Sequence, residues 1–140
     1  MQFTRREALV LGAGATAAAC LPLPALAATA VEEAVAAFTG GATPADGGVE
    51  IQAPEIAENG NTVPVSVSAR GATAILLLAD GNPNPGVATF HFGALAAGSA
   101  AATRIRLAQT QNLVAVAKMA DGSFAKAERN VKVTIGGCGG

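Results

Sequence analysis

The chain has 140 residues and a formal net charge of -1, from 9 lysines and arginines and 10 acidic residues. This balance excludes the strongly basic surface with which proteins bind nucleic acids or anionic membranes. With no Trp or Tyr and only 5 Phe, the core must be built from small aliphatic side chains. Such a core is thin, and a partner subunit that covers one face would help the domain to stay folded.

The first 27 residues have the pattern of an export signal. Arg5 and Arg6 supply a charged region, residues 8–21 an apolar region, and Ala25 and Ala27 a small-x-small cleavage site. We expect cleavage after Ala27. An adjacent arginine pair before an apolar run is typical of twin-arginine export, so we expect the mature protein in the periplasm.

Two other interpretations of this segment are weaker. A membrane anchor needs an apolar run of about 20 residues, and the run here is shorter and is followed by two prolines. A lipoprotein site at Cys20 would normally have Leu three residues earlier, where this chain has Ala17.

Residues 28–48 predict a short helix followed by a loop. Val31, Val35 and Phe38 recur at i, i+4 and i+7, which places them on one face of a helix that docks against the body. Residues 39–48 are rich in Gly, Thr and Asp and contain a proline, and therefore predict a loop.

Residues 49–135 predict a β-sandwich domain, because short β-type runs alternate there with turn residues. The seven predicted strands are residues 49–56, 63–68, 74–79, 87–92, 100–107, 113–119 and 128–135. With one helix before them and none between them, they favour an all-β fold, an immunoglobulin-like antiparallel β-sandwich, over an α/β fold.

The residue patterns within these strands indicate which side chains face the core. Residues 63–68 alternate valine with small or polar residues, so one face is buried. Residues 75–78 and 113–119 are apolar on both faces and are the candidates for the surface that meets a partner. Asp121 and Gly122 predict a hairpin, and Ile135 is expected to be the last inward anchor.

In residues 100–107, Ile105 and Leu107 are expected to point inward and Arg104 and Arg106 outward. The only histidine, His91, lies between Phe90 and Phe92 and should face away from the core if the phenylalanines face it. No second nitrogen or sulfur ligand lies nearby in the sequence, so we predict a surface or interface histidine and no metal site.

The C-terminal residues 136–140 form what we call the arm. They are, in order, Gly136, Gly137, Cys138, Gly139 and Gly140. Glycine has no side chain and few backbone restrictions, so this composition predicts a flexible tether for one thiol. From residue 136 to residue 138, at about 3.3 Å per extended residue, the tether spans roughly 10 Å.

Removal of residues 1–27 would leave Cys138 as an odd cysteine in an oxidising compartment. Such a residue indicates either an intermolecular disulfide or a free thiol with a function. The arm contains no Lys, Arg or His to favour a thiolate, so Cys138 looks like a carrier group that other proteins activate.

The arm, the Arg5-Arg6 signal and the strand-rich body together resemble the SoxY family, the sulfur-carrier subunits of bacterial thiosulfate oxidation. The resemblance implies a periplasmic heterodimer with SoxZ, in which Cys138 holds sulfur intermediates covalently. It also implies three enzyme partners: a c-type cytochrome that conjugates thiosulfate, a manganese-dependent hydrolase that releases sulfate, and a sulfane dehydrogenase. In that family the carrier itself is not an enzyme and needs no cofactor.

Two alternatives remain beside the carrier. An exported binding or structural module would use Cys138 for an intermolecular disulfide. A ubiquitin-like carrier would be activated at the carboxylate after Gly139 and Gly140, but such carriers work in the cytosol, and the export signal argues against one.

Overall fold

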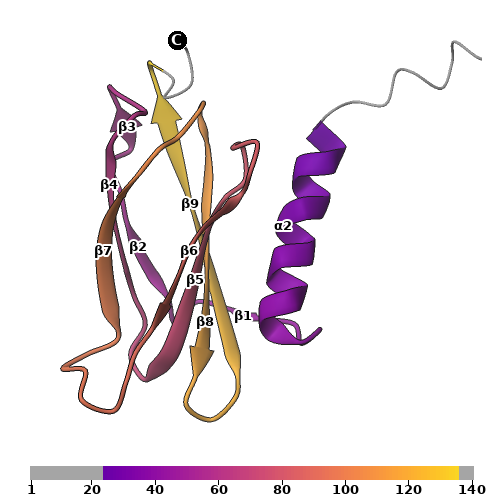
Figure 1. Ribbon diagram of the computed structural model, residues 1–140, viewed down its shortest axis with the longest axis vertical. Coiled ribbons are helices and arrows are strands. Elements are labelled where there is room, and N and C mark those ends of the chain that lie inside the picture. The colour runs from indigo at the N-terminus through magenta and orange to yellow at the C-terminus, as the bar shows by residue number, and fades with distance from the viewer. Residues whose placement is uncertain (1–23, 136–140) are drawn as a thin grey trace, which may run out of the picture.

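The computed structural model describes residues 24–135, in which one helix precedes a body made of strands (Figure 1). The elements in chain order are α2 (Pro24–Thr39), β1 (Ala45–Asp46), β2 (Glu50–Gln52), β3 (Ile56–Ala57), β4 (Val63–Ser68), β5 (Ala72–Ala79), β6 (Gly86–His91), β7 (Ala100–Ile105), β8 (Gln111–Met119) and β9 (Phe124–Val133). The predicted all-β sandwich with an N-terminal helix is confirmed.

The strands form two sheets. The larger sheet has the order β1-β9-β8-β5-β6, with β3 also paired to β9, and the smaller has the order β2-β4-β7. The longer pairs are antiparallel, whereas the two-residue strands β1 and β3 run parallel to β9. The prediction of seven antiparallel strands missed these two. Strand β1 falls in the expected loop, and β3 begins at residue 56, the last residue of the expected first strand, of which β2 covers residues 50–52.

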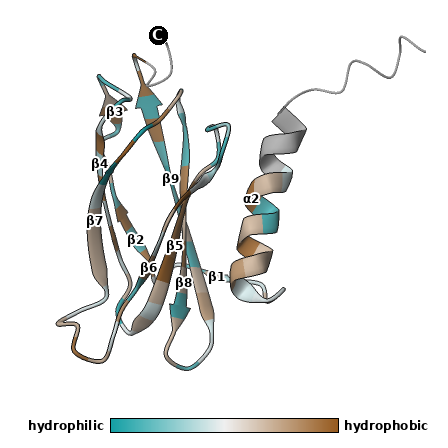
Figure 2. Ribbon diagram, viewed as in Figure 1, coloured by the Kyte–Doolittle hydropathy of each residue, from teal (hydrophilic) through white to brown (hydrophobic). Residues whose placement is uncertain are grey.

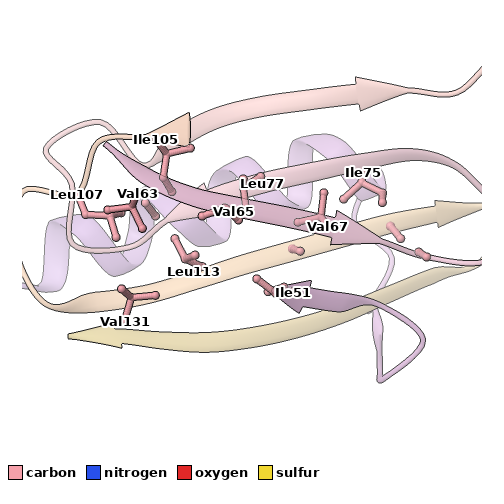
Figure 3. Close-up of a cluster of buried hydrophobic side chains, with 14 of the residues drawn as sticks. Ile51, Val63, Val65, Val67, Ile75, Leu77, Ile105, Leu107, Leu113 and Val131 are labelled. Carbon is pink, nitrogen blue, oxygen red and sulfur yellow. The ribbon is translucent and has the colours of Figure 1, made fainter. Parts of the chain in front are cut away.

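The main core lies between the two sheets (Figure 3). Along β4, Val63, Val65 and Val67 point inward and are almost fully buried, as the period of two in their sequence predicts. They belong to one hydrophobic cluster with Leu77 of β5 and Leu113 of β8. Full burial of an aliphatic side chain of this size contributes about 1.5–3 kcal/mol, so this cluster holds the two sheets together.

A second cluster lies on the other face of the larger sheet, under α2. It contains Leu76, Leu78, Val114 and Val116, against which Val31, Ala34, Val35, Phe38 and Phe124 pack. The rings of Phe38 and Phe124 meet edge-on, with centroids 6.0 Å apart. The predicted docking of the helix is confirmed, and α2 carries both apolar and polar segments (Figure 2).

This second cluster corrects the proposed partner surface. Both faces of β5 and β8 are buried within this chain, one by the smaller sheet and the other by α2. Residues 75–78 and most of residues 113–119 are therefore core, and they are not available to a partner subunit. The sequence showed that both faces are apolar, but not that the chain's own helix covers one of them.

Helix α2 is longer than its apolar stripe predicted, because it begins at Pro24, where proline suits the first position of a helix. The predicted cleavage residues Ala25 and Ala27 thus lie in its first turns. The helix ends at Thr39 and is followed by Gly40, whose φ is 66°; the N–H of Gly41 donates to the carbonyl of Ala36 over 3.1 Å. This is the usual glycine cap of a helix C-terminus.

The packing of α2 is incomplete. A pocket of about 420 Å³ lies beside the helix, lined by apolar residues such as Val35 and Val114 and by the ion pair of Lys126 with Glu128. The hydroxyl of Thr39 is buried there without a hydrogen-bond partner in the described part of the chain. No helix among the described residues is both long and apolar enough to cross a membrane.

The β8–β9 hairpin forms at Asp121 and Gly122, as predicted. Gly122 has a φ of 87°, and the N–H of Met119 donates to the carbonyl of Ser123 over 2.8 Å. The carboxylate of Asp121 accepts hydrogen bonds from the hydroxyl of Ser123 at 2.6 Å and from its N–H at 2.9 Å. These bonds, the hydroxyl's first, hold the pKa of Asp121 below its usual value.

Candidate functional site at the arm root

The predicted functional residues lie mostly outside the described residues. Cys138, the four glycines of the arm, Arg5 and Arg6 all lie there. The structure instead defines the point from which the arm leaves the sandwich. We call residues 133–135 the arm root; they lie at the end of β9, at the top of Figure 1.

On one side, the last residue of β3 and the segment that follows it hold the arm root. The N–H of Thr134 donates to the carbonyl of Ala57 over 3.1 Å, and its hydroxyl donates to the carbonyl of Glu58 over 3.2 Å. The N–H of Gly60 donates to the carbonyl of Ile135 over 2.8 Å. The short strand β3, which the sequence did not reveal, therefore brings a second chain segment alongside the exit of the arm.

Gly60 also connects the arm root to the core. Its carbonyl accepts a hydrogen bond of 2.8 Å from the N–H of Leu107, whose side chain is fully buried. The peptide groups on either side of Gly60 thus link the last described carbonyl of the chain to a core residue. Backbone hydrogen bonds of this kind contribute about 0.5–1.5 kcal/mol each.

On the other side, Thr110 holds the arm root through one hydroxyl. This oxygen accepts a hydrogen bond from the N–H of Val133 at 2.9 Å and lies 3.4 Å from the carbonyl of Val133, to which it donates. Thr110 lies in the loop between β7 and β8. Loops from two different places in the sequence therefore fix the same strand end.

Ile135 does not anchor the chain inward, and this expectation was wrong. Strand β9 ends at Val133, which is half-buried and packs against the main core, whereas the side chain of Ile135 is 64% exposed. The alternation of side chains depends on strand pairing, which has ended before Ile135. Its backbone carbonyl, and not its side chain, is the group that is anchored.

A network of side-chain amides stiffens the loops at this end of the sandwich. Gln111 is only 5% exposed. Its side-chain oxygen accepts a hydrogen bond from the N–H of Gly81 at 2.8 Å. Its side-chain nitrogen donates to Asn82 Oδ1 and to the carbonyl of Gln109, both at 2.9 Å. Asn82 Oδ1 also accepts from the N–H of Ala108 at 2.9 Å. These bonds join the loop after β5 to the loop before β8.

This network was not expected from the sequence, in which residues 80–86, rich in Asn and Pro, indicate only a loop. Asp80 extends the network, because its carboxylate accepts from the N–H of Asn112 at 2.8 Å and from its side-chain nitrogen at 3.1 Å. The amide of Asn112 in turn accepts from Asn130 of β9 at 2.9 Å.

The remaining predicted surface residues lie as expected. His91 is exposed, while Phe90 and Phe92 are half-buried against the main core. Arg104 and Arg106 are exposed. Within residues 24–135, no group of three or more His, Cys, Asp or Glu side chains is arranged to hold a metal ion.

Together these features define a class of protein: a small β-sandwich whose last strand is fixed on both sides and leads into a short cysteine-bearing segment. The family model of the sulfur oxidation protein SoxY matches residues 35–138. The solved structure of the sulfur carrier protein SoxY from Chlorobium limicola f thiosulfatophilum is 38% identical, with 78% of this chain and 96% of that chain covered and a TM-score of 0.69. The chain belongs to the SoxY family.

A more distant likeness concerns the fold alone. A superoxide reductase (neelaredoxin) from Ignicoccus hospitalis is 22% identical, covering 61% of this chain and 78% of that chain, with a TM-score of 0.54. The same sandwich architecture therefore occurs in proteins with a different activity. No curated protein matches the sequence.

Proposed function

We propose that this protein is a periplasmic sulfur carrier that holds thiosulfate-derived intermediates covalently on Cys138 and presents them to partner enzymes. One observation carries the proposal: the SoxY family match extends through residue 138, the single cysteine of the predicted mature chain. The likeness to a sulfur carrier protein at 38% identity supports the same role. The fixed arm root supports it further, because it gives the tether a defined origin.

The proposed loading step is an oxidation. The Cys138 thiolate and thiosulfate form one sulfur–sulfur bond, giving Cys–S–S–SO₃⁻, and the two electrons released pass to a c-type cytochrome. Since a thiolate is the nucleophilic form of cysteine, the enzyme must supply the groups that favour it. The arm itself has no basic residue for this purpose.

The next proposed step is a hydrolysis. Water attacks the terminal sulfone, the bond between that sulfur and the next one breaks, and sulfate and two protons leave, so that a persulfide Cys–S–S⁻ remains. A manganese-dependent hydrolase would carry this out. A sulfane dehydrogenase would then oxidise the remaining outer sulfur to Cys–S–SO₃⁻: three waters supply the oxygens, six protons are released, and the six electrons pass to a redox partner that accepts them. The manganese would belong to the hydrolase, and in both steps the carrier would be a substrate.

The arm glycines have a steric role in this proposal. Gly136, Gly137, Gly139 and Gly140 leave the tether without side chains, so that the arm fits a narrow channel and turns freely within it. We further propose that the chain works as a heterodimer with SoxZ, since its thin aliphatic core benefits from a second subunit.

Intact-mass analysis of the mature protein tests the proposal. After incubation with thiosulfate and the conjugating cytochrome, we expect a mass increase that corresponds to a thiosulfonate adduct and that a thiol reductant reverses. Cys138→Ser should abolish it completely. If the variant accepted the same adduct, the carrier role of Cys138 would be wrong; if the parent formed only disulfide-linked dimers, the structural module would be the better interpretation.

A further inference from the structure

The position of the arm root limits how an enzyme can reach Cys138. Cys138 is three residues beyond Ile135, the last residue that the structure places, so at about 3.3 Å per residue its backbone lies within roughly 10 Å of that point. An enzyme that encloses the thiol in a channel must therefore bring the rim of the channel against the residues that surround the arm root. This contact is imposed by the length of the arm.

Two exposed hydrophobic side chains lie at the arm root among exposed polar residues, where such a rim would lie. Among the described residues, the large hydrophobic side chains that are exposed are Ile56 (57%), Leu95 (101%) and Ile135 (64%). Two of the three are at this end of the molecule. Ile135 directly precedes the arm, and Ile56 of β3 is in register with Lys132 of β9, three residues before Ile135.

The two isoleucines are held in place by the bonds already described. The carbonyl of Ile135 is fixed by Gly60, and the N–H of Lys132 donates to the carbonyl of Glu55, next to Ile56, over 2.9 Å. A surface that is ordered before binding loses less conformational entropy when it binds. Exposed single hydrophobic residues are ordinary in proteins, but these two lie where the short arm forces contact.

We infer that Ile56 and Ile135 form the docking surface for the enzyme that joins thiosulfate to Cys138. The inference rests on the proposed carrier function and adds to it the protein surface that the enzyme recognises. An exposed polar residue, Lys132, borders Ile56, as expected for an apolar contact with a polar rim. Two side chains make a small contact, which suits a carrier that must dissociate after each transfer.

Steady-state kinetics of adduct formation test the inference, with the mature carrier and its partner subunit as substrate and the conjugating cytochrome as enzyme. We expect Ile135→Ser and Ile56→Ser each to raise KM for the carrier about five- to tenfold, with kcat nearly unchanged, because truncation of an interface residue weakens association. Leu95→Ser is the matched control, since Leu95 is fully exposed at the opposite end, and its KM should equal that of the parent.

Alkylation of Cys138 by iodoacetamide is the second measurement, because it reports access to the thiol without any enzyme. Its rate should be the same in the parent and all three variants. An unchanged KM in both isoleucine variants would overturn the docking surface and leave the carrier function intact. A rise in KM that is matched by an equal slowing of alkylation in the same variants would also overturn it, because the thiol itself would then be less accessible. If the parent itself accepted no adduct, the proposed function would fail, and the docking surface with it.

Discussion

The two ends of the sandwich differ in how their loops are held. At the arm end, Gln111, Asn82 and Thr110 connect the loops to one another and to β9 through side-chain hydrogen bonds. At the opposite end, shown at the bottom of Figure 1, the loop that contains Gly93 and Leu95 projects into solvent. The chain thus concentrates its polar side-chain bonding at the end from which the arm leaves, where a fixed origin matters to the proposed function.

Truncation of Gln111 should damage the arm end most. Gln111→Ala removes an acceptor from the N–H of Gly81 and a donor from the Asn82 oxygen, in a site that is almost fully buried. We expect a loss of about 2–3 kcal/mol in the free energy of unfolding, because buried polar groups are left without partners. Urea denaturation monitored by circular dichroism measures it.

Gln52 provides the control for this prediction. Gln52 is exposed, and within residues 24–135 its amide donates to the carboxylate of Glu50 alone, over 2.9 Å. Gln52→Ala should therefore change the free energy of unfolding by less than about 0.5 kcal/mol. Equal losses in the two variants would contradict the view that the amide network stiffens the arm end.

Paired glycine substitutions compare the two ends directly. A β-carbon at Gly81 would lie 2.8 Å from Cβ of Gln111, whereas one at Gly93 would have no atom within 4 Å. We expect Gly81→Ala to cost about 1–3 kcal/mol through overpacking, and Gly93→Ala to leave the free energy of unfolding within about 0.5 kcal/mol of the parent. Thermal denaturation of both variants checks this; a tolerated Gly81→Ala would mean that the loops at the arm end are loosely packed.

The smallest predicted effect is at the opposite end, in the turn of the β8–β9 hairpin. Ser123→Ala removes the hydroxyl that donates to Asp121, so the pKa of Asp121 should rise toward its ordinary value. In the parent, the lowered pKa stabilises the fold above the ordinary carboxyl pKa, and this contribution is lost as the pH falls through the lowered value. An NMR titration of the Asp121 carboxyl measures the shift, and an unchanged pKa would show that the hydroxyl does not cause it.

The regular parts of the fold were predictable from the sequence, because their signals are local. The alternating valines of β4 gave its bounds and its buried face, and the Asp121-Gly122 pair gave the hairpin. The short strands β1 and β3 were not predictable, since two residues have no periodicity and their pairing partner, β9, lies far along the chain. The covering of β5 and β8 by α2 depends on tertiary packing in the same way.

The chemistry of the candidate site stays a prediction from the sequence, whereas the hydrogen bonds that support it came only from the structure. The arm composition, with Cys138 between glycines, pointed to a tethered thiol. The arm root could not be foreseen, because its hydrogen bonds join residues far apart in sequence, such as Thr110 to Val133 and Glu58 to Thr134. The period of two was extended to Ile135 although the strand pairing ends earlier.

The pairing of β9 has a mechanical consequence for the proposed function. If an enzyme holds the arm as proposed, its release would pull on the carbonyl side of Ile135. Because β9 is paired antiparallel to β8 over most of its length and parallel to β3 at its end, that tension is resisted in shear by many backbone hydrogen bonds together. Gly60 transmits part of the load to Leu107 in the main core. Under the proposed function, the pairing of the last strand would thus anchor the arm against repeated pulling.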